Sequence, residues 1–122
     1  MKGDASRGRL AHASGLRAEA LAALMLQLKG YRILARRMKT RAGEIDLVAK
    51  RGRLLVFVEV KARADMLAAA DALAMRQRLR LARAAELFVS TRPALGHLDM
   101  RFDVVLVAPR RWPRHLADAW RP

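Results

Sequence analysis

The chain has 122 residues, no cysteine and a formal net charge of +14 at pH 7, and 53% of its residues are hydrophobic. The missing cysteine excludes disulfides and cysteine-ligated zinc, and the apolar fraction argues against intrinsic disorder despite the charge. Such a basic surface favours nucleic acid as the partner, with ribosomal RNA, an anionic membrane surface or a general arginine bias as alternatives.

The beginning of the chain predicts a helix preceded by a short arm. Residues 1–13 show no apolar period, so we expect a mobile basic arm ahead of a single domain over residues 14–108. Between a candidate N-cap at Ser14 and a stop at Gly30, the chain is rich in Ala and Leu and predicts a helix. The apolar run over residues 21–28 is too short to span a bilayer, which indicates a buried helix rather than a signal peptide. We therefore expect no membrane association, and the absence of cysteine fits the cytoplasm.

The middle of the chain predicts three strands. Residues 31–38 form the first, and residues 44–49 and 54–62 form a hairpin around a turn at residues 50–53. From Leu54 onward the third strand is apolar almost without interruption, which is typical of a central strand buried on both faces. Strands joined by such short turns should be antiparallel.

The rest of the chain predicts a second helix, one more strand and a tail. Apolar residues recur at helical spacing over residues 71–89, and residues 100–107 alternate as a strand that Pro109 ends. Residues 109–122 are expected to form a basic tail with two tryptophans. The intervening helix permits a parallel, right-handed crossover. The predicted fold is α/β, of order α-β-β-β-α-β, with a four-stranded mixed sheet flanked by helices.

Charged side chains at the end of the apolar third strand indicate a chemical site. A lone buried carboxylate costs several kcal/mol, so Glu59 needs a partner there. Residues two apart share a strand face, and Lys61 therefore points the same way as Glu59. The alternative is a purely structural Glu59–Lys61 ion pair.

The hairpin brings a second carboxylate to this face. If its turn centres on residues 51–52, Asp46 lies opposite Phe57 and Glu44 lies opposite Glu59. Asp46 and Glu59 are then diagonal neighbours, with Cα atoms roughly 7–8 Å apart, and can reach one ion between them. Oxygen ligands of this kind suit Mg²⁺ or Mn²⁺. The alternative is an Asp46 in an ordinary position near a turn.

A divalent cation at this place would polarise a phosphodiester and lower the pKa of a bound water. Lys61 beside it could hold the attacking water or stabilise charge in the transition state. Glu19 shares a helix face with Ala22 and Leu26 and could join the metal shell through water; the alternative is an acidic residue favoured only by the helix dipole.

Two segments give the chain a resemblance to a known family. Residues 43–49 (GEIDLVA) and 56–63 (VFVEVKAR) resemble the signature of the YraN family, bacterial proteins with a predicted endonuclease fold that is distantly similar to archaeal Holliday junction resolvases. The resemblance runs from residue 14 to residue 107 and takes in residues 101–105 (RFDVV) of the last strand.

The resemblance implies a restriction-endonuclease-like core. It implies acidic metal ligands at Asp46 and Glu59 with the Lys61 ammonium beside them, and Glu19 matches the acidic position of the first helix. The chain departs from the family at Arg76, where members often carry lysine, and residues 64–70 lack a glycine often seen there. These departures concern the substrate side of the site.

Other residues have a functional and a structural interpretation. Four arginines are candidates for phosphate contact, with a solvated surface as the alternative: Arg63, Arg76, Arg80 and Arg83. The histidines show no metal-site spacing and are expected to be exposed or locally bonded: His12, His97 and His115. Trp112 and Trp120 could stack on unpaired bases or anchor the chain end to the core. Arg101 and Asp103 share a strand face and could pair.

Together these observations favour an enzyme. The first hypothesis is a metal-dependent nuclease that hydrolyses DNA with Mg²⁺ or Mn²⁺, and the family analogy allows branched or single-stranded DNA as the substrate and a homodimer as the assembly. The second is a non-catalytic nucleic-acid-binding protein that keeps the nuclease fold. The third is a basic scaffold for ribosomal RNA.

Overall fold

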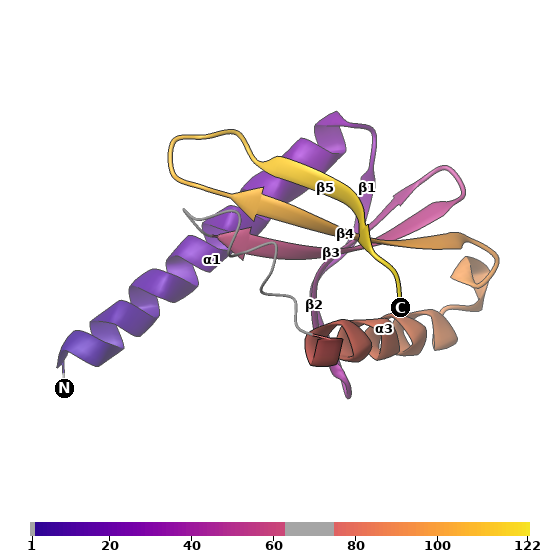
Figure 1. The fold of residues 1–122 in the computed structure, drawn as a ribbon, viewed down its shortest axis with the longest axis horizontal. Helices are drawn as coiled ribbons and strands as arrows, with labels where there is room; N and C mark the ends of the chain where they lie inside the picture. The colour runs from indigo at the N-terminus through magenta and orange to yellow at the C-terminus, as the bar shows by residue number, and fades with distance from the viewer. Residues whose placement is uncertain (1, 63–74) are drawn as a thin grey trace.

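The computed structural model describes residues 2–62 and 75–122, and these form a mixed five-stranded sheet with α-helices on both faces (Figure 1). Side chains are described for residues 15–61 and 76–122. The elements in chain order are α1 (Lys2–Leu28), β1 (Arg32–Thr40), β2 (Gly43–Arg51), β3 (Leu54–Ala62), α3 (Met75–Ser90), the short 3₁₀ helix η1 (Pro93–Leu95), β4 (Asp99–Val107) and β5 (Arg114–Trp120). No helix in this described part of the chain combines the length and apolarity needed to cross a bilayer.

The sheet has the order β1-β2-β3-β4-β5. β1, β2 and β3 pair antiparallel, β3 and β4 pair parallel, and β5 returns antiparallel to β4. The predicted α/β class, the antiparallel hairpins and the parallel crossover are therefore confirmed. The carboxyl ends of β3 and β4 point to the same end of the sheet, on the left in Figure 1.

The prediction of four strands was wrong because the end of the chain adds a fifth. Trp120 is buried at 6% exposure and lies against Phe102, with ring centroids 4.3 Å apart. The interpretation of Trp120 as an anchor is thereby confirmed, whereas Trp112 is exposed. Most residues of β5 are polar or exposed, so the apolar alternation that reveals a strand is weak in this segment.

Two predicted boundaries differ from the structure. α1 begins at Lys2, ahead of the predicted start at Ser14, because a stretch without an apolar face can still continue a helix that packing fixes further along. α3 is described from Met75, and the predicted start at Asp71 lies outside the described residues.

Two apolar clusters lie on opposite faces of the sheet. On one face Val56 and Val58 of β3 pack with Ala22 and Leu26 of α1. On the other face, Leu55 and Phe57 pack with residues of α3: Leu81, Ala84, Ala85 and Phe88. All four consecutive β3 residues are at most 3% exposed, which confirms a central strand buried on both faces. Burying each such side chain contributes roughly 1.5–3 kcal/mol.

The hairpin register differs from the predicted one by two residues. Arg51 pairs with Leu54, and Val48, not Asp46, lies opposite Phe57. The turn centres one residue later because Gly52 takes its first position with a φ of +60°, which glycine adopts at little cost. Moving the centre by one residue moves each partner by two, so the alternation between faces is kept.

Candidate functional site

Asp46 and Glu59 meet where regular pairing of β2 with β3 ends. The last paired residues are Leu47 and Val58, and beyond them the Val60 amide donates a hydrogen bond of 2.8 Å to Asp46 Oδ2. The Asp46 carboxylate thus accepts a β3 amide in place of a backbone carbonyl. The Asp46 and Glu59 carboxyl groups lie close enough that each affects the pKa of the other.

The surroundings raise the pKa of both carboxyl groups. Burial and the nearby Asp46 charge raise the pKa of Glu59 to about 7, against the opposing effect of Lys61. Burial also raises the pKa of Asp46, while the Val60 amide acts to lower it. Because two neighbouring carboxyl groups do not both ionise easily, the pair holds a proton to higher pH than isolated carboxyl groups do.

Two donors converge on a single oxygen of Glu59. Lys61 Nζ lies 3.2 Å from Glu59 Oε1, and Gln77 Nε2 donates to the same Oε1 at 3.2 Å. Lys61 follows Glu59 by two residues on β3, while Gln77 reaches over from the first turns of α3. The orientation of the Glu59 carboxyl group is therefore fixed from both its own strand and the covering helix.

A second set of carboxylates includes Asp46 and not Glu59. Glu19 of α1, Glu44 and Asp46 each offer an oxygen, and these oxygens lie within 4.8 Å of one another. Burial and the Asp46 charge raise the pKa of Glu19. Arg37 Nε lies 3.8 Å from Glu19 Oε2 and 3.8 Å from Glu44 Oε1. We call Glu19, Glu44 and Asp46 the acidic triad.

A small pocket of about 120 Å³ opens beside Asp46 and Glu59, between the sheet and α3. Its lining includes the side chain of Arg80, whose stem crosses close to Gly43. A Cβ atom at Gly43 would lie 3.0 Å from Arg80 Cδ, and the Gly43 φ of +144° is one that residues with side chains rarely adopt. Glycine at this position therefore lets an arginine lie at the rim of the acidic pocket.

The donor set fits a hard divalent cation. Every candidate ligand is a carboxylate oxygen, which is the ligand that Mg²⁺ and Mn²⁺ prefer, and the described part of the chain offers no cysteine or histidine at this place. Burial is the largest cause that raises the pKa of Glu19, Asp46 and Glu59, and the charges of neighbouring carboxylates raise each of them further. A cation among these groups would offset their mutual repulsion.

The structure brings together most of the residues that the sequence predicted. Asp46, Glu59 and Lys61 converge as expected, and Glu19 approaches Asp46 from α1. Arg80 lines the pocket, whereas Arg76 and Arg83 are exposed on α3 and do not line it. Arg63 lies outside the described residues.

Three residues of the site were missed by the sequence interpretation. Glu44 precedes Asp46 by two, and the alternation of a strand could have assigned it to the site. Gln77 and Arg37 carry no such signal, because the position of α3 over β3 and the backbone conformation of Arg37 are tertiary properties.

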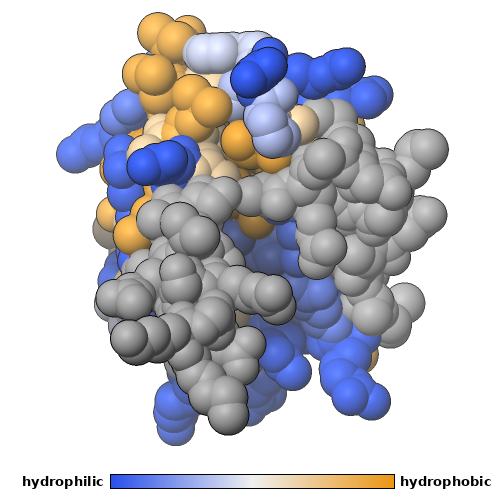
Figure 2. Space-filling model, turned by 90° about the vertical axis from the view of Figure 1, so that its left-hand side faces the viewer, coloured by the Kyte–Doolittle hydropathy of each residue, from blue (hydrophilic) through white to orange (hydrophobic). Residues whose placement is uncertain are grey.

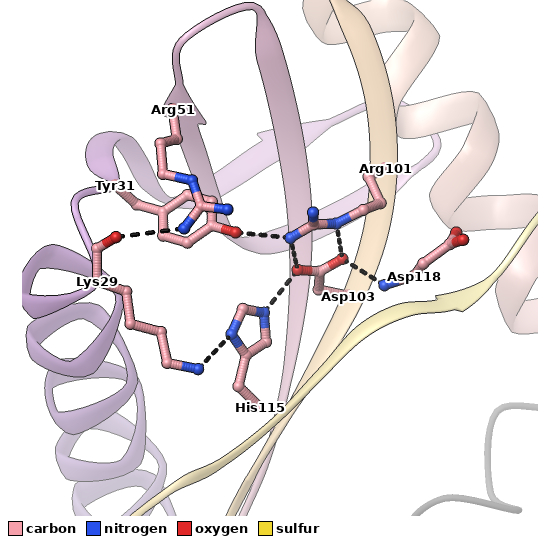
Figure 3. Close-up of polar contacts among 7 residues, drawn as sticks. All are labelled: Lys29, Tyr31, Arg51, Arg101, Asp103, His115 and Asp118. Atoms are coloured by element: carbon pink, nitrogen blue, oxygen red, sulfur yellow. Dashed lines mark hydrogen bonds and ion pairs between the residues drawn. The ribbon is translucent and has the colours of Figure 1, made fainter.

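A separate polar network lies on the face of the sheet that α1 covers (Figure 3). The buried Asp103 carboxylate accepts two hydrogen bonds from Arg101, at 2.8 and 2.7 Å, and one from the Asp118 amide at 2.9 Å, and lies 2.6 Å from His115 Nε2. Burial alone would raise the pKa of Asp103, but these donors outweigh it and lower the pKa to about 2. The predicted Arg101–Asp103 pair and the local bonding of His115 are thereby confirmed.

The network connects three parts of the chain. Arg101 also donates to the Tyr31 hydroxyl at 2.7 Å, and Lys29 Nζ lies 3.0 Å from His115 Nδ1. Because an ammonium group can only donate, His115 must accept at Nδ1 and donate from Nε2 to Asp103. The segment after α1, β4 and β5 are thus held together (Figure 3), which is a structural role.

Comparison with known proteins gives one family. A sequence model described as "Uncharacterised protein family UPF0102" matches residues 18–107. A UPF0102 protein of Parvibaculum lavamentivorans is 62% identical, over 99% of this chain and 91% of the relative. Relatives from Methylorubrum extorquens and Maricaulis maris are 53% and 54% identical; the alignments cover 94% and 93% of this chain and 90% of each relative.

Proposed function

Because the chain belongs to UPF0102, the YraN family, we propose from the chemistry of its site that it is a metal-dependent nuclease acting on DNA phosphodiester bonds. The observation that carries the proposal is the pocket that Asp46 and Glu59 line together at the end of a buried strand, with Lys61 on Glu59 and the acidic triad around Asp46. Structural ion pairs balance their charges, whereas this site gathers an excess of carboxylates inside a strongly basic protein.

Asp46 and Glu59 would hold Mg²⁺ or Mn²⁺, with Glu19 and Glu44 completing the oxygen shell directly or through water. When bound, the cation would polarise the phosphate and acidify a water molecule. The Val60 amide would hold the Asp46 carboxylate toward the proposed cation site, and Gln77 would hold the Glu59 carboxyl group there. Glu59 must release its proton before it can serve as a ligand, and Lys61 at 3.2 Å favours that ionised form.

Lys61 has a second role during hydrolysis. The reaction forms a bond from the water oxygen to phosphorus, breaks one phosphorus–oxygen ester bond and delivers a proton to the leaving oxygen. With the charge of Glu59 balanced by a cation, the Lys61 ammonium would be available to orient the water or to stabilise negative charge on the phosphate oxygens. Arg80 at the pocket rim would bind the same or a neighbouring phosphate.

The surface supports an anionic substrate. On the side of the molecule toward which β3 ends, the coloured atoms in the lower half of Figure 2 are almost all hydrophilic. The net charge of +14 would draw DNA to the protein, and Arg63, Arg76 and Arg83 are further proposed phosphate contacts. Branched or single-stranded DNA, a homodimer and action in the cytoplasm belong to the same proposal.

Cleavage assays test this function. Linear duplex, single-stranded and four-way-junction DNA would be incubated with the protein in Mg²⁺ or Mn²⁺, and we expect cleavage that EDTA abolishes. Asp46→Asn and Lys61→Ala should lose it, while Asp99→Asn, at an exposed position on β4, should not. Equal cleavage by all these proteins would assign the activity to a contaminant or another site.

A non-catalytic DNA-binding protein is the second candidate, and the net charge favours it independently of the site. This candidate predicts that the protein binds DNA equally tightly with and without a divalent cation. The Asp46→Asn substitution should then leave both DNA affinities unchanged. Fluorescence anisotropy in EDTA and in Ca²⁺, which supports binding without requiring cleavage, separates the two candidates.

A further inference from the structure

Arg37 places a positive charge beside the acidic triad. A single atom of its guanidinium group, Nε, is 3.8 Å from both Glu19 and Glu44, two of the three members of the acidic triad. It therefore bridges α1 and β2 through the carboxylates that we propose as parts of the metal shell. Its charge also acts to lower the pKa of Glu19, against burial and the Asp46 charge.

The backbone at Arg37 is held in an unusual conformation. Its φ is +51°, in the left-handed region that costs an ordinary residue roughly 1–2 kcal/mol. On β1 it lies between Arg36, paired with Leu47, and Met38, paired with Ile45, and the residue between those partners on β2 is Asp46. Such a conformation persists only where the surroundings determine it, and here it occurs beside the acidic triad.

We propose that the Arg37 guanidinium is the resident counter-cation of the acidic triad, and that a divalent cation exchanges with it. The inference rests on the proposed function, because it needs the metal to bind beside Asp46. Three neighbouring carboxylates repel one another unless a positive charge lies among them, and Arg37 supplies that charge without metal. The Arg37 side chain is 40% exposed, so it can leave without unpacking the core.

The exchange has a consequence for substrate binding. A released guanidinium group beside the site can pair with phosphate through two parallel hydrogen bonds. Metal loading would thus convert Arg37 from a partner of carboxylates into a partner of DNA. The chain then holds DNA most firmly in the state that is ready for hydrolysis.

Arginine side-chain NMR tests the exchange without any cleavage. The Nε–H resonance of Arg37, identified by its absence in Arg37→Ala, should shift and exchange faster with water as Mg²⁺ saturates the protein. The neighbouring Arg36, which forms no ion pair with any residue that the structure describes, provides the comparison. An Arg37 resonance unchanged at Mg²⁺ saturation would overturn the inference.

Calorimetric titration with Mg²⁺ provides the second measurement. Arg37→Ala should bind Mg²⁺ about fivefold more tightly than the parent, because the cation no longer displaces a partly exposed ion pair. Arg36→Ala removes the same charge nearby and should change the affinity less than twofold. Equal or weaker binding by Arg37→Ala would contradict the exchange while leaving the metal site intact. A parent that binds no Mg²⁺ would overturn the proposed function together with this inference. If Arg37→Ala folds poorly by circular dichroism, Arg37→Gln serves in its place.

Discussion

Val60 and Asp46 are joined where the ladder between two strands stops: the backbone amide of the first donates to the carboxylate of the second at 2.8 Å. A side chain that serves as the last acceptor of a ladder is fixed to the backbone frame. The β3 backbone therefore fixes the position of the Asp46 carboxylate.

Asp46→Asn should weaken Mn²⁺ binding by at least about tenfold while leaving the fold intact. The amide oxygen of asparagine can still accept from Val60, but it carries no charge for a cation. Calorimetric titration gives the affinity and circular dichroism the fold. Asp99→Asn removes an exposed charge elsewhere and is the matched control. Equal Mn²⁺ affinity in parent and Asp46→Asn would remove Asp46 from the metal site.

The raised pKa of Glu59 predicts a loss of stability with rising pH. The pKa is about 7 in the folded protein against 4.5 for an ordinary glutamate, so the folded state holds the proton more tightly. The contribution is fully present below pH 4.5 and is lost as pH rises through 7. The midpoint temperature of Glu59→Gln should therefore fall less than that of the parent over this window.

Exposed Glu86→Gln is the control for that pH series, and its curve should run parallel to the parent curve. Mg²⁺ should restore most of the stability lost by the parent above pH 7, because the cation takes the place of the proton. Parent and Glu59→Gln curves of identical slope would show that Glu59 titrates normally.

Substitutions in the Asp103 network should lower the free energy of unfolding without acting on the candidate site. Arg101→Ala removes two hydrogen bonds from a carboxylate that is 1% exposed, and should lower the free energy of unfolding by roughly 3 kcal/mol. Urea unfolding measures the change. Arg121→Ala breaks an exposed pair with Asp118 and should leave the midpoint unchanged. A small effect of Arg101→Ala would mean that His115 and the Asp118 amide suffice for Asp103.

Replacing Gly43, which lies against Arg80 of the pocket, is expected to lower the stability of the protein. Gly43→Ala forces a side chain into a φ of +144° and against Arg80, and should cost about 1–3 kcal/mol of unfolding free energy. Gly15→Ala is the matched control, because its Cβ meets nothing within 4 Å in a helix that favours alanine, and it should be neutral or stabilising. Adding Arg80→Ala to Gly43→Ala should recover the steric part of the loss. If the double variant is no more stable than Gly43→Ala, the whole loss of unfolding free energy comes from the backbone conformation at residue 43.

Much of the fold follows from local pattern. The unbroken apolar run of β3 predicted its central place, and the charged residues at its end predicted the site. The Asp46–Glu59 proximity was predicted through a register that was wrong by two residues, and it survived because such a shift keeps each residue on its face.

The remainder depends on long-range packing. β5 forms because Trp120 lies on Phe102 and Asp103 gathers donors, contacts that no window of the sequence contains. Gln77 reaches Glu59 only once α3 covers the sheet. The left-handed backbone of Arg37 follows from its surroundings and not from its residue type.

The two outer strands of the sheet share an irregularity. β1 has a register shift between Ile33 and Ala35 and a left-handed Arg37, and β5 has a left-handed Asp118 near a shift opposite Phe102 and Val104. Bent edges of this kind are poor templates for another strand. Pairing of two copies through their sheet edges is therefore disfavoured. The homodimer that we propose is expected to form through helices or loops.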